Sequence, residues 1–446
     1  EYRVRFYTGV GVQFVNTSGS NPRGAQLRVR PLFDVKDDNG NIQGLLRLEI
    51  GDIEFGNGGG AIGVTNAGAG GNITPGGARV GNGSGGSGGN DGVNVETKWA
   101  WIDAAFPFGI PLRARAGLQP WYLPKGLIID DDTVGVRLYG SVKPVSYDVA
   151  WYRPNGGPNT AAALGSGQAG QAVTSNVFDN NYDFYQAKVD VAIAEFFNPG
   201  IYYIFARNAA FGTAPGGGTT VPYNNSQDSN FIGFTATGKV GIVGYDFDFV
   251  YGSQEGGPSG NYPTAVATVD VAGFAVDAAV HVPIGPVTLN LAGSYATGDK
   301  RDGGDSEAFP YIAPSWNGPG GLFHMIGSGG PFDQVEYTQD APTNLWTVGL
   351  TADYRPVKQL LLTAGAAYAG FAKNSGNCAV APLNPNPCFG PAYPVLAGKS
   401  TLGAEFFLTA YWDIWTGFKL QGDIGFLVPP TGKTAQEYVL QMLYSF

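Results

Sequence analysis

The feature that most constrains this chain is an alternation of apolar and polar residues with a period of two, repeated along nearly its whole length. In the first segment, Tyr2, Val4 and Phe6 share one face. Arg3 and Arg5 share the other. This period is typical of a β-strand whose two faces meet different surroundings. No run of 18 or more apolar residues interrupts the pattern, so the sequence contains no candidate transmembrane helix.

The composition excludes several classes of protein. Only 14% of the residues are charged, whereas soluble proteins typically carry about 25%. The net charge of −10 argues against a nucleic-acid partner. Two histidines, His281 and His324, provide few groups for metal or acid–base chemistry. The chain begins at Glu1 rather than at Met, and we expect that an export segment has been removed.

Short and long connections alternate between the strand-like segments. Tight turns are expected at residues such as 36–41, 143–144 and 197–200. The longer connections between them are expected to be extracellular loops, the largest at about 56–92, 154–181, 298–343 and 372–400. This order predicts a single all-β domain over residues 1–446, an antiparallel up-and-down barrel of 18 strands, with 16 as the alternative. In lipid only helices and closed barrels satisfy their backbone hydrogen bonds, which favours this barrel over a secreted soluble all-β protein.

The end of the chain carries the most specific motif. Apolar residues alternate up to the last position at Tyr438, Leu440, Met442, Tyr444 and Phe446. This pattern resembles the closing strand of Gram-negative outer-membrane porins, and the alternating strands extend the resemblance over the whole chain. The resemblance implies a channel for passive diffusion of small hydrophilic solutes and ions, without enzymatic activity. It also implies a homotrimer in outer-membrane lipid and assembly by the barrel-assembly machinery, which would read Tyr444 and Phe446.

Charged residues on the polar faces are unevenly distributed along the chain. The early strands carry a set of arginines that we call the basic arc: Arg3, Arg5, Arg28, Arg30, Arg47, Arg113, Arg115 and Arg137. The later strands carry carboxylates instead: Asp190, Asp246, Asp248, Asp277, Asp353, Glu405 and Asp423. We expect the two sets to line opposite sides of a water-filled lumen. The arginines favour anionic or carboxylate solutes and the acids favour cations, so the sequence leaves the selectivity open.

A barrel of this size encloses a wide aqueous channel, so we expect an inward loop to narrow it. Segment 120–132 is the favoured candidate, because Asp130, Asp131 and Asp132 would place acidic charge against the basic arc. Segment 298–343 is the alternative, since it carries several aromatic residues that could pack inside the lumen.

An acidic stretch within the second candidate loop predicts a candidate Ca²⁺ site. Its members are Asp299, Asp302, Asp305 and Glu307. Oxygen clusters of this kind suit Ca²⁺, which could bridge to lipopolysaccharide phosphates. A solvated acidic loop is the alternative interpretation, and no other cofactor is expected.

The cysteines and tryptophans add two further expectations. Cys378 and Cys388 would lie outside the cytoplasm, where a disulfide between them is expected. Several tryptophans are assigned to the lipid-facing surface, where such rings anchor a membrane protein: Trp99, Trp101, Trp151, Trp346 and Trp412. That assignment counts against a sugar-specific channel.

Two other functions remain as alternatives to a channel. One is a non-conducting structural barrel. The other is an outer-membrane hydrolase, for which His281 and His324 are the available bases. Neither histidine lies in a recognisable catalytic motif.

Overall fold

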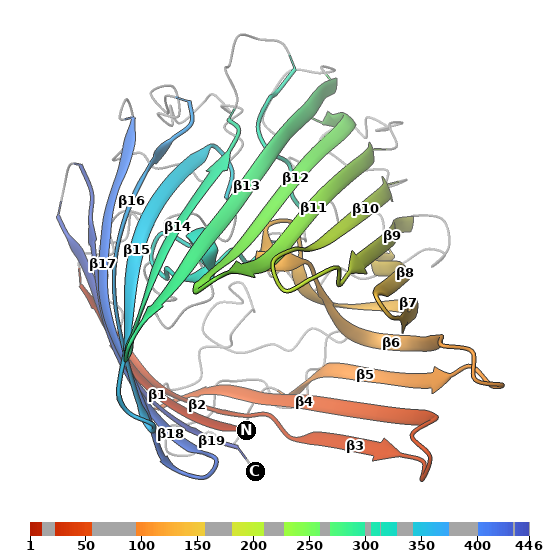
Figure 1. Cartoon of the computed structure of the whole chain (residues 1–446), viewed down its shortest axis with the longest axis horizontal. Helices are drawn as coiled ribbons and strands as arrows, with labels where there is room; N and C mark the ends of the chain where they lie inside the picture. Colours follow the sequence, from red (N-terminus) through yellow and green to blue (C-terminus); the bar gives the residue numbers. More distant parts are fainter. Residues whose placement is uncertain are drawn as a thin grey trace, which may run out of the picture.

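The computed structural model of the chain describes residues 1–10, 23–55, 95–156, 181–208, 227–258, 268–298, 305–312, 314–327, 342–373, 400–430 and 433–445. Over these residues nineteen strand segments form one antiparallel sheet. The sheet closes on itself, because β1 (Tyr2–Val10) pairs with both β2 (Arg23–Val29) and β19 (Ala435–Tyr444). Figure 1 shows the strands arranged around a central space. In the described part of the chain, no helix is both long and apolar enough to cross a membrane.

The remaining strands follow one another around the barrel in chain order. The first group is β3 (Leu32–Lys36), β4 (Ile42–Glu54), β5 (Val95–Ala105), β6 (Arg113–Tyr122), β7 (Asp130–Val142), β8 (Val145–Gly156), β9 (Asn181–Val191) and β10 (Asn198–Asn208). The second group is β11 (Gln227–Val240), β12 (Val243–Pro258), β13 (Thr268–Ile284), β14 (Val287–Ala296), β15 (Leu345–Val357), β16 (Leu360–Phe371), β17 (Thr401–Trp415) and β18 (Phe418–Val428). Two 3-10 turns are also described, η1 (Pro124–Gly126) and η3 (Pro319–Gly321).

The segments β2 and β3 are two parts of one barrel strand. Both pair with β4, β2 through Leu27 and Ile53, and β3 through Phe33 and Leu46. The break falls at Pro31, which has no N–H for the ladder. Counted as one strand, β2 and β3 bring the total to 18, which confirms the number predicted from the sequence.

Short turns join the strands at one end of the barrel, as predicted. The β11–β12 turn needs only residues 241–242, and Gly241 has a φ of 61°, a conformation that glycine adopts without strain. The prediction was wrong in detail for the β9–β10 turn, which spans 192–197 rather than 197–200. There Ala194 and Phe197 form a bridge before β10 begins, so the chain reverses earlier than its composition indicates.

The period-two pattern becomes an apolar outer surface and a polar inner one. On β1, Phe6 faces outward and is 40% exposed, whereas Arg5 faces inward and is 3% exposed. The same alternation leaves Phe406 and Leu408 of β17 on the outer surface. Glu405 of that strand is completely buried on the inner side.

The hydrophobic core lies inside the barrel rather than within its wall. Residues 123–129, 305–312 and 314–327 leave the strands and fold inward, and Figure 1 shows η1 and η3 inside the ring of strands. Their apolar residues pack with inward-facing side chains, mainly of β8 to β17. The buried cluster includes Leu127, Ile128, Phe309, Trp316 and Phe323 from these segments. The inward segments therefore fill one side of the lumen.

Candidate functional site

The predicted basic arc gathers on the inner face of β1 to β7. Cross-strand pairs place its members together, with Arg3 opposite Arg28 and Arg115 opposite Arg137. Opposite residues in an antiparallel pair project from the same face. The arginines of this arc thus form a continuous part of the wall.

Carboxylates that were not predicted in this arc lie among the arginines. Glu1 contacts Arg28, Arg30 and Arg47 at 3.5, 3.8 and 3.7 Å. Glu49 contacts Arg28 at 4.0 Å and also Arg30. These two acids hold the guanidinium groups of three arginines in place, so one positive charge among these side chains is not neutralised.

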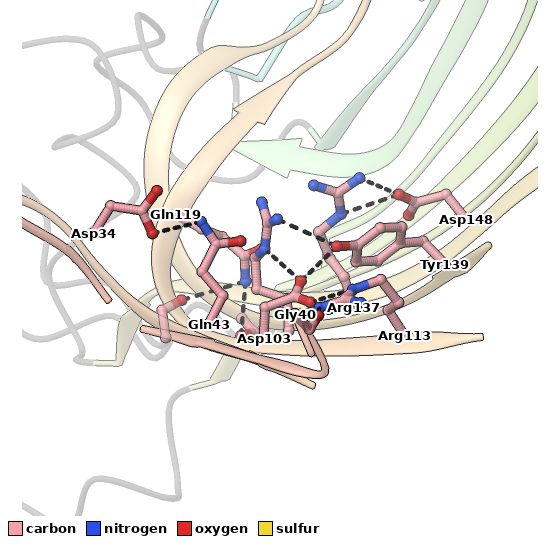
Figure 2. Close-up of polar contacts among 12 residues, drawn as sticks. Asp34, Gly40, Gln43, Asp103, Arg113, Gln119, Arg137, Tyr139 and Asp148 are labelled. Atoms are coloured by element: carbon pink, nitrogen blue, oxygen red, sulfur yellow. Dashed lines mark hydrogen bonds and ion pairs between the residues drawn. The ribbon is translucent and has the colours of Figure 1, made fainter. Parts of the chain in front are cut away.

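A second polar cluster centres on Asp103, which is 1% exposed (Figure 2). Its carboxylate accepts hydrogen bonds from Arg113 Nε at 2.6 Å, from Arg115 Nε at 3.0 Å and from the Tyr139 hydroxyl. Arg137 donates from Nε to Asp148 at 3.0 Å. Asp103 could have been found from the sequence, because a carboxylate within an alternating strand indicates which positions face inward. In the structure it lies opposite Arg115 in the ladder.

Two tryptophans stand on the inner face, not the outer one. The Arg115 guanidinium lies 3.9 Å from the ring centre of Trp101, and that of Arg47 lies 4.5 Å from the ring centre of Trp99. The lipid-face assignment of these two residues was therefore wrong. A guanidinium over an aromatic face is favourable, so these rings are stable beside charged groups. Trp412 does face outward and is 49% exposed.

A cavity of about 670 Å³ opens near the short-turn end of β6 to β9. Its lining includes Arg113, Arg137, Lys188, Tyr139 and Tyr122. Because Tyr122 comes directly before the inward segment 123–129, the cavity extends from the short turns toward the narrowed part of the lumen.

The described parts of both candidate loops fold into the lumen and contact each other. Ile312 donates its backbone N–H to the Ile128 carbonyl at 3.1 Å, and Ser315 donates to Gly126 at 3.1 Å. Gly126 has a φ of 63°, and a Cβ there would lie 2.4 Å from the Ser315 carbonyl oxygen. The two segments therefore narrow the channel together.

The acidic triplet is not part of the inward segment. Asp130, Asp131 and Asp132 begin β7, because β6 and β7 extend past the predicted loop ends and leave only 123–129 to turn inward. Asp132 contacts Lys98 Nζ at 2.6 Å and accepts the Trp99 Nε1–H at 2.6 Å. The triplet lies in the wall beside the basic arc, so its predicted position across the pore was wrong.

Lys125, at the tip of the first inward segment, meets three predicted wall acids. Its ammonium contacts Asp277 at 2.7 Å, Asp248 at 3.1 Å and Asp246. Burial alone would lower the pKa of Lys125, but the charges of Asp277 and Asp248 and hydrogen bonds to Asp246 and Asp277 outweigh it, so this pKa is raised. Lys125 therefore stays protonated and neutralises part of this acidic group. Lys125 was not among the residues predicted to line the channel.

Glu405 holds the second inward segment. Its carboxylate accepts the backbone N–H groups of His324 at 3.0 Å and Ile326 at 2.8 Å. Burial lowers the pKa of His324 to about 4, so its ring is neutral at neutral pH. Glu405 thus binds protein backbone rather than solute.

The predicted acidic wall is largely covered. Asp248, Asp277, Glu405 and Asp423 are each at most 5% exposed. Asp423 accepts hydrogen bonds from Gln421 at 3.0 and 3.1 Å. The expectation that these four acids face channel water was wrong, because inward segments and neighbouring side chains shield them. Asp246 keeps more contact with solvent, with 23% of its side chain exposed.

Several predicted sites fall wholly or partly outside the described residues. Cys378, Cys388 and Phe446 lie there, as do Asp299 and Asp302 of the acidic loop. Among the residues that the structure does describe, no group of three or more potential ligands could hold a metal ion. The disulfide and the calcium site stay predictions. Tyr444 is described and faces outward on β19, with 44% exposure.

The barrel is similar to solved outer-membrane structures. It aligns with OccK8 (OprE) of Pseudomonas aeruginosa at 11% identity and a TM-score of 0.54, covering 99% of this chain and 96% of that one. OpdK of the same organism, solved with vanillate, aligns at 8% identity and a TM-score of 0.54, covering 99% and 97%. A BenF-like porin from Pseudomonas fluorescens Pf-5 aligns at 10% identity and a TM-score of 0.55, covering 99% and 96%. At such low identity the likeness establishes the fold.

Comparison by sequence identifies the family. No curated protein matches the chain. A family model described as the porin subfamily matches residues 159–386, just over half of the chain. The chain therefore belongs to the porin subfamily and forms a channel in the outer membrane of a Gram-negative bacterium.

Proposed function

We propose that this porin passes small anionic solutes, carboxylates among them, in preference to cations of similar size. The single observation that carries the proposal is the unequal accessibility of charge in the lumen. The arginines of the basic arc occupy the side that the inward segments leave open, whereas four of the acids predicted opposite them are covered. A solute in the channel water therefore meets the arginines, the exposed Asp130 and Asp131 beside them, and few of the acids predicted on the opposite side.

Electrostatics favours this preference even though the arginines have carboxylate partners. Arg28, Arg30 and Arg47 share the acids Glu1 and Glu49. Arg113 and Arg115 share Asp103. Positive charge is thus in excess in both clusters. Arginine stays ionised at any working pH, and its fixed donors suit carboxylates. A charged wall raises the local concentration of ions of opposite sign, more strongly at low ionic strength.

The cavity near the short turns supports a resting position for such a solute. Its cationic groups, Arg113, Arg137 and Lys188, are accompanied by the hydroxyls of Tyr139 and Tyr147 and by the carboxylates of Asp148 and Asp190. Each cation pairs with a wall acid, so a carboxylate solute would bind there by competing with those acids. Vanillate, with which the similar OpdK structure was solved, is an anion that could use both kinds of contact.

The deciding experiment is the reversal potential of the purified porin in a planar bilayer under a KCl gradient. We expect a reversal potential with the sign of a chloride-preferring channel, and a larger preference for chloride over potassium at lower salt. Arg47→Met should reduce the preference. Lys239→Met is a matched control, because Lys239 lies at the end of β11 beside Glu195 and away from the arc. A potassium-preferring wild-type channel would contradict the proposal, and equal permeation of anions and uncharged solutes would indicate a general diffusion porin.

We also propose that solutes cross without covalent change. His281, one base considered for a hydrolase, contacts Asn290 at 2.8 Å and Asp246 at 2.7 Å. Both ring nitrogens are thereby occupied by wall residues rather than by a hydroxyl nucleophile. Incubation with ester substrates should release no product above the rate in buffer.

A homotrimer and contacts with lipopolysaccharide and the assembly machinery are further proposals for partners. A groove of about 510 Å³ on the outer surface, lined in part by Ala410, Gly422 and Leu440, supports contact with a second copy. Ala364 and Ala366 of β16 leave a neighbouring part of this surface smooth and exposed. Native mass spectrometry in detergent should detect a trimer, and a monomer would contradict this proposal.

A further inference from the structure

We propose that Asp277 is the positioning residue that holds both inward segments against the wall, and that its partner Lys125 sets the charge of the narrowed lumen. Channel width and ion preference would then depend on a single buried group of charges. The inference uses the channel function but does not require the proposed anion preference.

Asp277 receives donors from two segments that are far apart in the sequence. It lies on β13 and is completely buried. One carboxylate oxygen accepts Lys125 Nζ at 2.7 Å and the Gly320 N–H at 2.9 Å. The other accepts Trp316 Nε1–H at 3.0 Å. Lys125 belongs to the first inward segment, and Trp316 and Gly320 belong to the second. One side chain therefore anchors both.

The wall beside Asp277 is shaped for close approach of the second segment. Gly320 has a φ of 65°, and a Cβ there would lie 2.8 Å from Ala292 Cβ and 2.9 Å from Ala279 Cβ. These alanines face inward on β14 and β13 and are almost fully buried. Only a small residue in a left-handed conformation fits against them. The Gly320 N–H can therefore reach Asp277 only because the Gly320 backbone packs closely against the two alanines.

Lys125 has a second consequence, which is electrostatic. Asp246 and Asp248 also contact its ammonium, so three carboxylates share one cation. Removing the ammonium would leave their negative charge without this cation, next to the channel. Removing the Asp277 carboxylate would instead delete one negative charge and leave Lys125 with two partners. The two changes therefore alter the local charge in opposite directions.

Glu405 provides a second anchor, but for one segment alone. It accepts the N–H groups of His324 and Ile326, beyond Gly320 in the same segment. Without Asp277, the second segment would still be held at that point. The first segment would keep its backbone bonds to the second but lose its ionic anchor. We therefore expect a displaced arrangement of both segments without loss of the barrel.

The test compares Asp277→Asn and Lys125→Met by single-channel conductance and by reversal potential. Removing one partner of a buried ion pair should raise the population of displaced segments roughly a hundredfold, so both variants should conduct more than the wild type. Their selectivities should move in opposite directions, Lys125→Met toward cations and Asp277→Asn toward anions. Lys125→Arg should restore much of the wild-type behaviour. A structural defect alone would move both variants alike.

Asp353→Asn is the matched control, since Asp353 is another inward-facing carboxylate that binds the wall side chains Asn290 and Thr363. It should leave conductance near that of the wild type. Folding of each variant is checked by heat-dependent mobility on a gel. If Asp277→Asn does not insert, Lys125→Met still tests the proposal, because Lys125 lies outside the strands. Unchanged conductance in the folded variants, or a selectivity shift of the same sign in both, would overturn the proposal. A cation-preferring wild type would contradict only the anion proposal.

Discussion

Both sides of the lumen carry charged side chains on the inward-facing positions of their strands, but these side chains have different roles on the two sides. On β1 to β7, Arg47 and Arg115 lie over tryptophan rings and beside carboxylates at the margin of the open channel. On β13 and β17, Asp277 and Glu405 are completely buried under segments that they bind. One side can attract solutes, while the other positions the segments that narrow the path.

This difference shows that inward orientation alone does not make a residue pore-lining. Alternation determines which face a side chain occupies, and a second layer of chain then determines whether water reaches it. Carboxylates are suited to the covered side because they accept several donors at once, including backbone N–H groups. Arginines are suited to the open side because their charge persists in water.

The largest expected effect comes from removing the aromatic centre of the covered side. Trp316 is fully buried in the inward core and donates to Asp277. Trp316→Ala should cost about 3–5 kcal/mol of packing free energy and should raise single-channel conductance. Trp412→Ala, the same change on the outer surface, should leave conductance unaltered. Equal conductance in both variants would show that the inward core does not control the channel width.

Acid should weaken the packing of the inward segments on the covered side of the lumen, the side of Asp277 and Glu405, before it affects the charge of the arginines. Burial lowers the pKa of His324 to about 4 from 6.5, so a displaced segment binds a proton that the folded segment does not. The contribution of this neutral ring to the free energy of unfolding is fully present above pH 6.5 and is lost as the pH falls toward 4. The total loss is about 3 kcal/mol.

Conductance and thermal unfolding measured from pH 7 to pH 4 would check this expectation. The wild type should open and lose stability as the pH falls. His324→Gln should show a flatter dependence over the same range. The carboxylates remain in both proteins, so the difference between the two curves isolates the histidine. Parallel curves would mean that this ring does not couple pH to the inward segment.

A smaller effect should follow from a change at the contact between the inward segments. Gly126→Ala would place a Cβ 2.4 Å from the Ser315 carbonyl oxygen at a φ of 63°. The left-handed conformation alone costs roughly 1–2 kcal/mol, and the clash should separate the segments. Gly40→Ala has a similar φ of 68° but meets no atom within 4 Å. Only Gly126→Ala should increase conductance, as measured by single-channel recording.

Much of this comparison could be predicted from the sequence, because the barrel depends on local alternation and connection length. The 18 strands and the inner position of the arginines follow from these patterns. The covered state of Glu405 does not, since it depends on residues 324 and 326, which are distant in sequence. No local pattern indicates that Lys125 reaches Asp277.

Aromatic residues were misleading for a related reason. A tryptophan in an alternating strand is commonly assigned to the lipid side, and Trp101 would be placed there by that rule. The parity of Asp103 contradicts it, and Arg115 across the ladder supplies a polar neighbour that can cover the ring. Assigning faces from ionised residues first would have placed both Trp99 and Trp101 correctly.

The smallest effect should separate the charge of the basic arc from its packing. Arg115→Lys keeps the positive charge but loses the planar contact with Trp101 and the paired contacts with Asp103 and Tyr139. The lost ring contact should cost about 0.5–1 kcal/mol, a small decrease in the temperature of unfolding, while the reversal potential stays close to that of the wild type. Arg115→Met should lower the unfolding temperature similarly and also reduce the anion preference. Were Arg115→Lys to shift selectivity as far as Arg115→Met, the geometry of the guanidinium rather than its charge would govern the open side.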